Sequence, residues 1–583
     1  MKLPPQMSLD ISGRRPLSSG NARMLNELAV ELRPQLVKLI DQISSEQLNN
    51  MDWWVTPLAS RNPFASNLFL NCCRLMLLEK LLELQQAPAE VWVDSPAMLK
   101  LAEKLASEHC VKLKVRVARL QYWHENFLRP LKSLLVSIYH SASQLACAKL
   151  IMPQQSVADS PLIVIDTFVY SSSIKNGVFY DRNFPSINEH LEPEERLRLR
   201  YFPTFYKIRN YPKIFLKLRS LRGSFLLKED YLKLSDYFYA FGHGVRVRRI
   251  KIQPRLMFGR LPLNLMLCEE LRRGWMWPSA IEGLLKFRAI ARMSHANVQV
   301  GRALDWFENQ DIDRGANAGF RRYYPNTEVV GYVGYAASQH YLCMYPSAEE
   351  MRARILPTRF AVMGSGFVNT MSEFCPDAIV EIAPALRYSA QPQKVQNGNA
   401  SEVFSILVAL PVIRAEALEV LATIVPLLAG FKEIQLAGRK IQFFIKPHPA
   451  GESMRNYDFG DFSNSSVIKW ADESLDKLLG RADVLISTAS SACFEALMMG
   501  VPVVVLGSRY GLTFVPIPLA IPQEQWKICY SWKEMQYAIE ALHDESIEEL
   551  ESNSLATKLL RREYLEPVSR AGVRRFFLGV DDE

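Results

Sequence analysis

Short apolar runs alternate with amphipathic stretches along most of the chain, and this alternation predicts the secondary structure. In the first part, the predicted strands are residues 52–55, 90–93, 112–117 and 162–166. The predicted helices are residues 25–43, 68–84, 96–108 and 127–150, where apolar residues recur every three or four positions. Strands that alternate with helices of this length are typical of a parallel, doubly wound sheet.

The pattern loosens in the middle of the chain and then returns. Residues 179–260 are rich in Tyr, Phe, Lys and Arg, and we interpret them as an inserted helical subdomain. We predict that its basic and aromatic residues form a solvated face over a local core. The alternative is that they contact lipid headgroups. Strands are predicted at residues 329–333 and 359–364, and the polar, turn-rich residues 391–402 are predicted to be a linker.

A second alternating unit follows the linker. Its predicted strands are residues 404–410, 441–445, 484–486 and 501–506, and its predicted helices are residues 414–428, 474–479, 490–499, 532–542 and 547–564. The fold class is therefore α/β with two Rossmann-like domains facing a cleft. The expected units are a flexible N-terminus (1–22), an N-terminal domain (23–390), the linker (391–402), a C-terminal domain (403–545) and a C-terminal helical segment (546–583) that returns to the N-terminal domain.

Composition narrows the class of protein. The 583 residues are 49% hydrophobic and 22% charged, with a formal net charge of +8, which is typical of folded globular domains. The nine cysteines form no CxxC pair, so neither a zinc site nor a disulfide framework is indicated. No apolar run is long enough to predict a transmembrane helix, and the N-terminus lacks the pattern of a secretory signal. We expect a cytoplasmic protein that does not bind nucleic acid.

The sequence Lys446-Pro447-His448-Pro449 directly follows a predicted strand. Ligands of open α/β sheets bind beyond the carboxyl ends of the strands, so these residues are predicted to border a ligand. The prolines restrict the backbone around His448, whose imidazole can donate to a phosphate oxygen while Lys446 supplies a charge. The alternative is a structural histidine that caps a turn.

A hydroxyl-rich segment follows the next predicted strand, at Ser487, Thr488, Ser490 and Ser491. Such hydroxyls at the start of a helix favour an anion site, and Glu495, one turn later, is placed to bind ribose hydroxyls. The alternative is ordinary N-capping, with Glu495 in a capping box. Because one serine is enough for a cap, we favour the binding site.

These two motifs resemble the nucleotide-binding domain of GT-B glycosyltransferases. The sequences KPHP and STASSACFEALMMGVPVVVLG are most similar to bacterial transferases that use CMP-activated acidic sugars, namely sialic acid and Kdo. The resemblance implies that His448, Pro449, Ser490 and Ser491 bind the CMP phosphate. The segments WWVTPLASRNPF, FENQDIDRG and PALRY also resemble a family of surface-carbohydrate biosynthesis proteins. The EALxxGxPVV pattern is shared with nucleotide-sugar epimerases.

The catalytic carboxylate is expected in the N-terminal half. Glu308, among aromatic and amide residues, is the first candidate for a general base or a nucleophile. Asp305 would share its face if this stretch were helical, and Asp166 ends a predicted strand. The acidic motif of the sialyltransferases is not recognisable here, which leaves the base and the stereochemical outcome open. Arg61 and Asn62, in a predicted loop, are candidates for binding the acceptor or the sugar carboxylate.

The expected function is glycosyl transfer from a CMP-linked nonulosonate or Kdo-type donor to a bacterial surface glycan, without a cofactor or metal. The acceptor would be a polysaccharide or glycolipid, and the enzyme could contact the inner membrane peripherally. One alternative keeps the fold for an epimerase or a CDP-glycerol glycerophosphotransferase. The other is a scaffold without catalytic activity.

Overall fold

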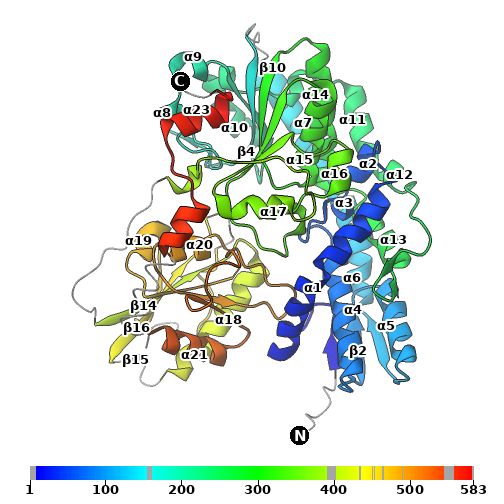
Figure 1. Cartoon of the computed structure of the whole chain (residues 1–583), viewed down its shortest axis with the longest axis vertical. Coiled ribbons are helices and arrows are strands. Elements are labelled where there is room, and N and C mark those ends of the chain that lie inside the picture. Colours follow the sequence, from blue (N-terminus) through cyan, green and yellow to red (C-terminus); the bar gives the residue numbers. More distant parts are fainter. Residues whose placement is uncertain are drawn as a thin grey trace.

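The computed structural model contains three parallel sheets (Figure 1). It describes residues 8–580 apart from 154–159, 390–401, 432–434, 437, 450, 452, 463–464, 489 and 544–556. The predicted linker (391–402) therefore lies almost entirely outside the described residues. So do residues 1–7 of the predicted flexible N-terminus and residues 546–556 of the predicted C-terminal segment.

The first sheet is small and stands apart from the two larger ones. Its strands are β1 (Ser8–Asp10), β2 (Glu90–Val93) and β3 (Lys114–Val117), and the helices around it are α1 (Ser19–Ser44), α4 (Leu68–Glu83), α5 (Pro96–Glu108) and α13 (Asn264–Arg273). Two expectations were wrong here. Residues 8–22 are ordered, because Leu9 and Ile11 join the core, and the first half contains two sheets instead of one.

The predicted strand at residues 52–55 is a helix. Here α2 (Met51–Trp54) and α3 (Pro57–Ser60) follow each other, each capped by the residue before it. The side-chain oxygens of Asn50 and Thr56 accept hydrogen bonds from the backbone N–H groups of Asp52 and Ala59. The short aromatic run has the composition of a strand, but these caps and full burial on every side favour the helix.

The second sheet is six-stranded and entirely parallel. Its order is β13 (Val380–Ile382), β12 (Arg359–Val362), β11 (Glu328–Val333), β10 (Val300–Trp306), β4 (Leu162–Val169) and β7 (Leu199–Phe205). One face packs on α14 (Pro278–His295) and α15 (Asp311–Tyr323). The other face packs on α7 (Arg129–Ile151), α10 (Tyr211–Leu218) and α23 (Arg570–Leu578).

Two parts of this sheet differ from the sequence prediction. Residues 179–260 are not an insertion, because β7 within them is the edge strand that pairs with β4 over seven positions. Strand β10 was not predicted. Its residues Gly301 and Arg302 break the apolar run, although Ala303 to Trp306 are buried.

The elements between the strands of this half are mostly short. They are α8 (Ile187–His190), α9 (Pro193–Arg196), α11 (Leu234–Phe241), α12 (His243–Val247), α16 (Ala348–Arg352), α17 (Val368–Ser372), and the hairpins of β5 (Ile174–Lys175) with β6 (Val178–Phe179) and β8 (Met257–Phe258) with β9 (Leu261–Pro262). Before α7, the helix α6 (Arg119–Trp123) continues through a π-helical turn, η1 (His124–Leu128).

The third sheet confirms the predicted C-terminal unit. Its parallel strands run in the order β17 (Ile468–Trp470), β16 (Arg439–Lys446), β14 (Val403–Ala409), β18 (Val484–Ser487), β19 (Val503–Leu506) and β20 (Trp526–Cys529), with β15 (Gln435–Leu436) antiparallel to β16. Its helices are α18 (Arg414–Gly430), α19 (Leu475–Leu479), α20 (Ala492–Met498) and α21 (Trp532–His543). The fold is thus α/β with two large Rossmann-like sheets, as predicted.

The two large units share a core and are also tied by the C-terminus. Phe494 of α20 contacts the rings of Phe367 and Tyr388 from the N-terminal half. After a helix at residues 557–564, α23 reaches back to the six-stranded sheet, where Phe576 and Phe577 are buried (red in Figure 1). This return of the C-terminal helix was predicted from the sequence.

Candidate functional site

Both large sheets have a topological switch point, where successive connections leave toward opposite edges. In the second sheet the chain passes from β4 to β7 on one side and then to β10 on the other. In the third sheet, β14 lies first, with β16 on one side and β18 on the other. Crevices at such points, beyond the carboxyl ends of the strands, are where open α/β sheets bind ligands.

The KPHP motif lies at the carboxyl end of β16, beside the switch point of the third sheet. Lys446 is the last residue of the strand, and its Nζ donates to the carbonyl of Asp472 at 3.3 Å. Burial lowers the pKa of the His448 imidazole to about 4, and the charges of Arg182 and Lys207 add to this effect. His448 is therefore neutral near pH 7 and carries one ring N–H. Pro449 begins the turn that follows.

The hydroxyl-rich segment divides into a structural part and an accessible part. Ser487 is fully buried, and its Oγ donates to the carbonyl of Ala409 at 2.7 Å, which joins β18 to β14. Thr488 is also buried. These two residues therefore do not fit the predicted contact with a ligand, because their side chains are enclosed where the strands end.

Ser490, Ser491 and Glu495 are half-buried. The Ser491 Oγ lies 3.4 Å from the Glu495 Oε1 and donates to it, and the Ser490 Oγ accepts from the backbone N–H of Ala492. These contacts also fit the capping alternative. Burial raises the pKa of Glu495, and the positive charge of Arg387 opposes the rise.

Cations of the N-terminal half lie close to these C-terminal residues. Arg182 acts on the pKa values of both His448 and Glu495, so it lies near both. Arg387 acts on Glu495 and on Glu308, and its guanidinium lies 5.7 Å from the centre of the Trp306 ring. The same cations of the N-terminal half therefore influence candidate residues of both halves.

Neither cation was singled out in the sequence as a ligand-binding residue. Arg387 belongs to the PALRY segment, which supported only the family resemblance, and Arg182 lies in a loop far from any motif. The position of Arg182 depends on the pairing of β4 with β7, and β7 was not predicted as a strand.

Glu308 lies just beyond the end of β10 and is held by donors on both carboxylate oxygens. The indole N–H of Trp306 donates to Oε1 at 3.1 Å, and the side-chain amide of Gln310 donates to Oε2. Gln310 also donates to the hydroxyl of Tyr341 at 2.9 Å. Burial raises the pKa of Glu308, and the Trp306 and Gln310 hydrogen bonds and the charge of Arg387 act against that rise.

The other two catalytic candidates lie deeper than predicted. Asp305 is on strand β10, not on a helix, and Asp166 lies inside β4, three residues before its end. The two are directly paired in the sheet. Asp166 forms an ion pair with Lys286, and Asp305 accepts from the Asn317 amide at 2.8 Å. Both carboxylates are enclosed by the α14–α15 layer and do not border the cleft, which argues against direct contact with a substrate.

A third carboxylate completes a buried acidic cluster. Asp166, Asp305 and Asp313 each place one carboxylate oxygen within 4.8 Å of the others, a spacing that a metal ion could use. Burial raises the pKa of Asp305 to about 7, and the nearby charge of Asp166 adds to the rise. Because Lys286 already supplies a cation to Asp166, the cluster is accounted for as a proton-sharing core group. That no metal takes part in the reaction stays a prediction.

The two predicted acceptor-binding residues are enclosed and serve the fold. The Arg61 side chain is fully buried, donates to the carbonyl of Tyr345 at 2.8 Å and lies 2.9 Å from the Glu350 carboxylate. Asn62 is buried, and its Oδ1 accepts from the backbone N–H of Phe64 at 3.0 Å, closing a turn. These contacts do not support the acceptor role of the two residues, which stays a prediction.

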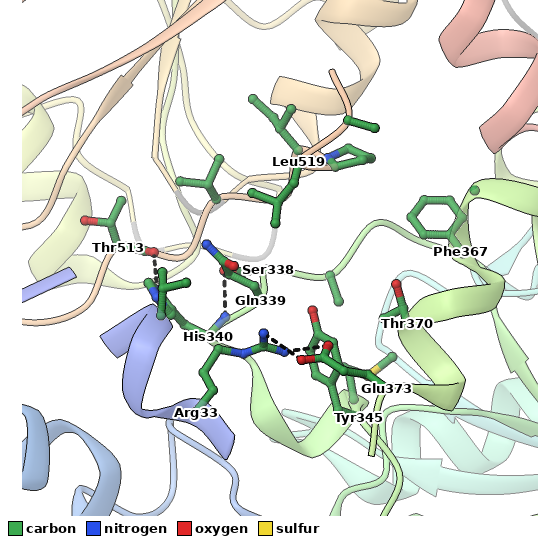
Figure 2. A pocket seen from close by; sticks show the side chains of 18 of the residues that line it. Arg33, Ser338, Gln339, His340, Tyr345, Phe367, Thr370, Glu373, Thr513 and Leu519 are labelled. Atoms are coloured by element: carbon green, nitrogen blue, oxygen red, sulfur yellow. Dashed lines mark hydrogen bonds and ion pairs between the residues drawn. The ribbon is translucent and has the colours of Figure 1, made fainter. Parts of the chain in front are cut away.

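A large pocket, which the sequence did not indicate, lies between α1, the loops after β11 and β12, and the loop after β19. Its volume is about 1090 Å³, and none of its lining residues belongs to the KPHP or hydroxyl-rich motifs. Figure 2 shows Arg33 bridged to Glu373, at 3.0 Å, and the His340 ring held by the carbonyl of Thr513, also at 3.0 Å.

Two residues that line this pocket carry buried acceptor atoms. His340 Nδ1 faces a carbonyl and therefore carries the proton, which leaves Nε2 as an acceptor. Nε2 and the Gln339 Oε1 are buried and have no hydrogen-bond partner within the described part of the chain. Tyr335, another lining residue, stacks on Trp306 with ring centres 5.7 Å apart, so one aromatic layer separates the pocket from Glu308.

Comparisons with known proteins relate the chain to others only at the level of overall shape. No family model and no curated protein matches it. Among solved structures, S. aureus MnaA with UDP is 11% identical with a TM-score of 0.38, and covers 72% of this chain and 98% of its own. Acinetobacter baumannii MurG is 13% identical with a TM-score of 0.38, and covers 72% and 100%. The trehalose 6-phosphate synthase of Burkholderia multivorans is 9% identical with a TM-score of 0.38, and covers 72% and 96%.

Proposed function

We propose that this protein is a glycosyltransferase that moves an acidic sugar, of the nonulosonate or Kdo type, from a CMP-linked donor to a bacterial surface glycan. One observation carries the proposal: Arg182 of the N-terminal half acts on both His448 and Glu495 of the C-terminal half, and Arg387 acts on Glu495. A cleft with cations on one wall, and an imidazole and a carboxylate on the other, fits a nucleotide with its phosphate and ribose.

The leaving phosphate is held in this proposal by groups from both walls. Arg182 and Lys207 supply fixed positive charge, and the neutral His448 donates one hydrogen bond. Glu495 accepts from the ribose hydroxyls. During transfer, the bond between the anomeric carbon and the phosphate oxygen breaks, and the electron pair leaves with CMP, whose negative charge these groups stabilise.

Glu308 is proposed to act on the acceptor side. In an inverting reaction, the acceptor hydroxyl attacks the anomeric carbon and its proton passes to the Glu308 carboxylate. The burial that raises the pKa of Glu308 makes it a stronger base. In a retaining reaction, the same carboxylate would be the nucleophile.

The 1090 Å³ pocket beside Tyr335 is the proposed site for a remote part of the glycan acceptor, whose reacting hydroxyl must lie at Glu308 on the other side of the aromatic layer. Its two unpartnered acceptor atoms, on His340 and Gln339, suit the hydroxyls of a sugar, and Phe367 and Leu519 supply an apolar wall. Burial lowers the pKa of His340 to about 4, so its ring is neutral near pH 7. The pocket therefore suits uncharged hydroxyls of the acceptor.

A thermal-shift panel of CMP, CDP, UDP and GDP tests the donor assignment. A ligand that binds the folded state raises the melting temperature, and we expect this with CMP. His448→Asn should reduce the shift, whereas His295→Asn, at an exposed histidine, should not. A shift with UDP alone would contradict the CMP donor, and a shift with CDP followed by glycerophosphate transfer would support the alternative phosphotransferase.

Glu308→Gln separates an enzyme from a scaffold. With a CMP-sugar and a glycan acceptor, transfer should fall by a factor on the order of 10² to 10⁴, the usual contribution of a general base. The CMP-induced thermal shift should remain, and Glu194→Gln on the surface should leave transfer unchanged. Full cellular function in the Glu308→Gln strain would favour the scaffold.

A further inference from the structure

The helical segment formed by α6, η1 and α7 carries an apolar stripe that no other part of the described chain covers. Its members recur every three or four residues and are exposed, with Leu120 at 85%, Phe127 at 60% and Leu135 at 61%. The other members of the stripe are Trp123, Leu131 and Ile138. The rings of Trp123 and Phe127 stack side by side, with centres 6.3 Å apart.

The opposite face of this segment is fixed to the protein. α7 packs against α10 and α14, and its Gln144, Cys147 and Ala148 are buried. The stripe is therefore the outward face of a helix whose other face belongs to the core. Six large apolar side chains in one row form a contiguous exposed patch, and such patches mark interaction sites in soluble proteins.

The helical segment carries net positive charge. Residues 119–151 contain four Lys and Arg and one acidic residue, Glu125, so they hold +3 of the chain's formal net charge of +8. Arg119 and Lys132 are exposed on the same segment as the stripe, whereas the Arg129 guanidinium lies 5.3 Å from the centre of the Trp277 ring. The negative charge of Glu125 acts on Arg273, whose pKa it helps to raise. It therefore offsets little of the positive charge on the outward face.

We propose that this segment docks the protein on an anionic lipid surface, with the apolar stripe in the boundary between headgroups and acyl chains. Trp, Phe and Leu beside Arg and Lys on a single helical face are the features of interfacial helices. The basic residues complement anionic headgroups. This surface differs from residues 205–219, where the sequence first suggested lipid contact, and the proposal does not depend on the sugar-transfer reaction.

The helix is proposed to lie on the membrane and not to cross it. Residues His124–Ile151 are long and apolar enough to span a bilayer, although the sequence led us to expect no such helix. However, Arg129 and Lys132 lie within this span, and the inner face is packed on α10 and α14. Insertion across the bilayer would remove that packing and place two charges in hydrocarbon.

Vesicle flotation of the full-length protein tests the proposal. We expect binding to phosphatidylcholine vesicles that contain phosphatidylglycerol, and weaker binding at high salt. The triple variant F127Q/L131Q/L135Q should bind at least about tenfold more weakly, because three side chains no longer enter the boundary layer. The matched control L197Q/I379Q/Y537Q changes three equally exposed apolar residues elsewhere and should bind like the wild type.

A charge variant provides a second measurement if the triple variant does not fold. R119Q/K132Q should lose about fivefold in binding for each charge removed, which corresponds to about 1 kcal/mol per charge near an anionic surface. Three results would overturn the proposal: equal binding by wild type and both variants, a wild-type dimer that the triple variant dissociates without any vesicle binding, or retention in vesicles after carbonate extraction.

Discussion

Replacing Arg182 by Gln should raise the pKa of the His448 imidazole, although the two residues belong to different halves of the chain. His448 has a pKa of about 4 because burial disfavours its charged form and because Arg182 and Lys207 repel a proton. Gln has nearly the size of Arg without the charge. The substitution therefore removes one of the two repulsive charges and leaves the burial unchanged.

The size of the effect follows from the depression of the pKa. A fall from 6.5 to about 4 corresponds to about 3 kcal/mol against protonation. Burial is the largest cause, and the two cations share the remainder. The removal of Arg182 should therefore recover about 0.5 to 1 pH unit, or roughly 1 kcal/mol, as expected for two charges separated by part of a solvated cleft.

Nuclear magnetic resonance of histidine-labelled protein can measure this pKa, since the chain has only nine histidines. The His448 resonance is assigned by its loss in His448→Asn. Arg322→Gln, at an exposed arginine on α15, is the control and should leave the His448 titration unchanged. If Arg182→Gln also leaves it unchanged, the two walls do not face each other and the proposed phosphate site is wrong.

Three further predictions concern other parts of the structure. Asp311→Asn should stabilise the protein at pH 8 by up to about 4 kcal/mol and leave its stability at pH 4 unchanged, as measured by urea melts. Burial raises the pKa of Asp311 to about 7, so the folded wild-type protein loses stability as pH rises from about 4 to 7. Parallel stability profiles of wild type and variant across this pH range would refute the prediction. Ser487→Ala should lower the free energy of unfolding by about 1 kcal/mol without changing CMP affinity, because its buried hydroxyl bonds the Ala409 carbonyl and the Cys493 thiol; weaker CMP binding would support its predicted ligand role. His340→Phe should raise the KM for the acceptor and leave the CMP thermal shift intact; an unchanged KM would place the acceptor elsewhere.

Sequence patterns predicted the C-terminal unit well because its strands are buried on both faces. Each of β14, β18 and β19 is a nearly continuous apolar run followed by turn residues, which local rules detect. Strand β10 was missed because polar residues interrupt its apolar pattern. Its Arg302 and Asp305 are polar yet buried, because Asn317 and neighbouring strands satisfy them only in the folded protein.

Sequence reasoning did not show which candidate residues the fold encloses, and the ligand roles of the others stay predictions. His448 was selected by the strand-end rule, whereas Glu308 was chosen for its aromatic and amide neighbours and Glu495 for its place one turn into a helix; all three are influenced by cations of the N-terminal half. Arg61 and Ser487 have suitable chemistry, but partners distant in the sequence enclose them. Only tertiary contacts distinguish these cases, since each residue has the same local sequence in either role.

The pH dependence of transfer should report on the carboxylate and not on the phosphate site. The positive charge near His448 and Glu495 comes from Arg182, Arg387 and Lys207. His448 stays neutral above about pH 5, because its pKa is about 4. Leaving-group stabilisation is therefore nearly constant between pH 5 and 9, whereas the raised pKa of Glu308 sets an acidic limb in the kcat/KM profile. The acidic limb should be absent from the pH profile of the residual activity of Glu308→Gln. If the limb persists, another group titrates there, and that group, not Glu308, is the base.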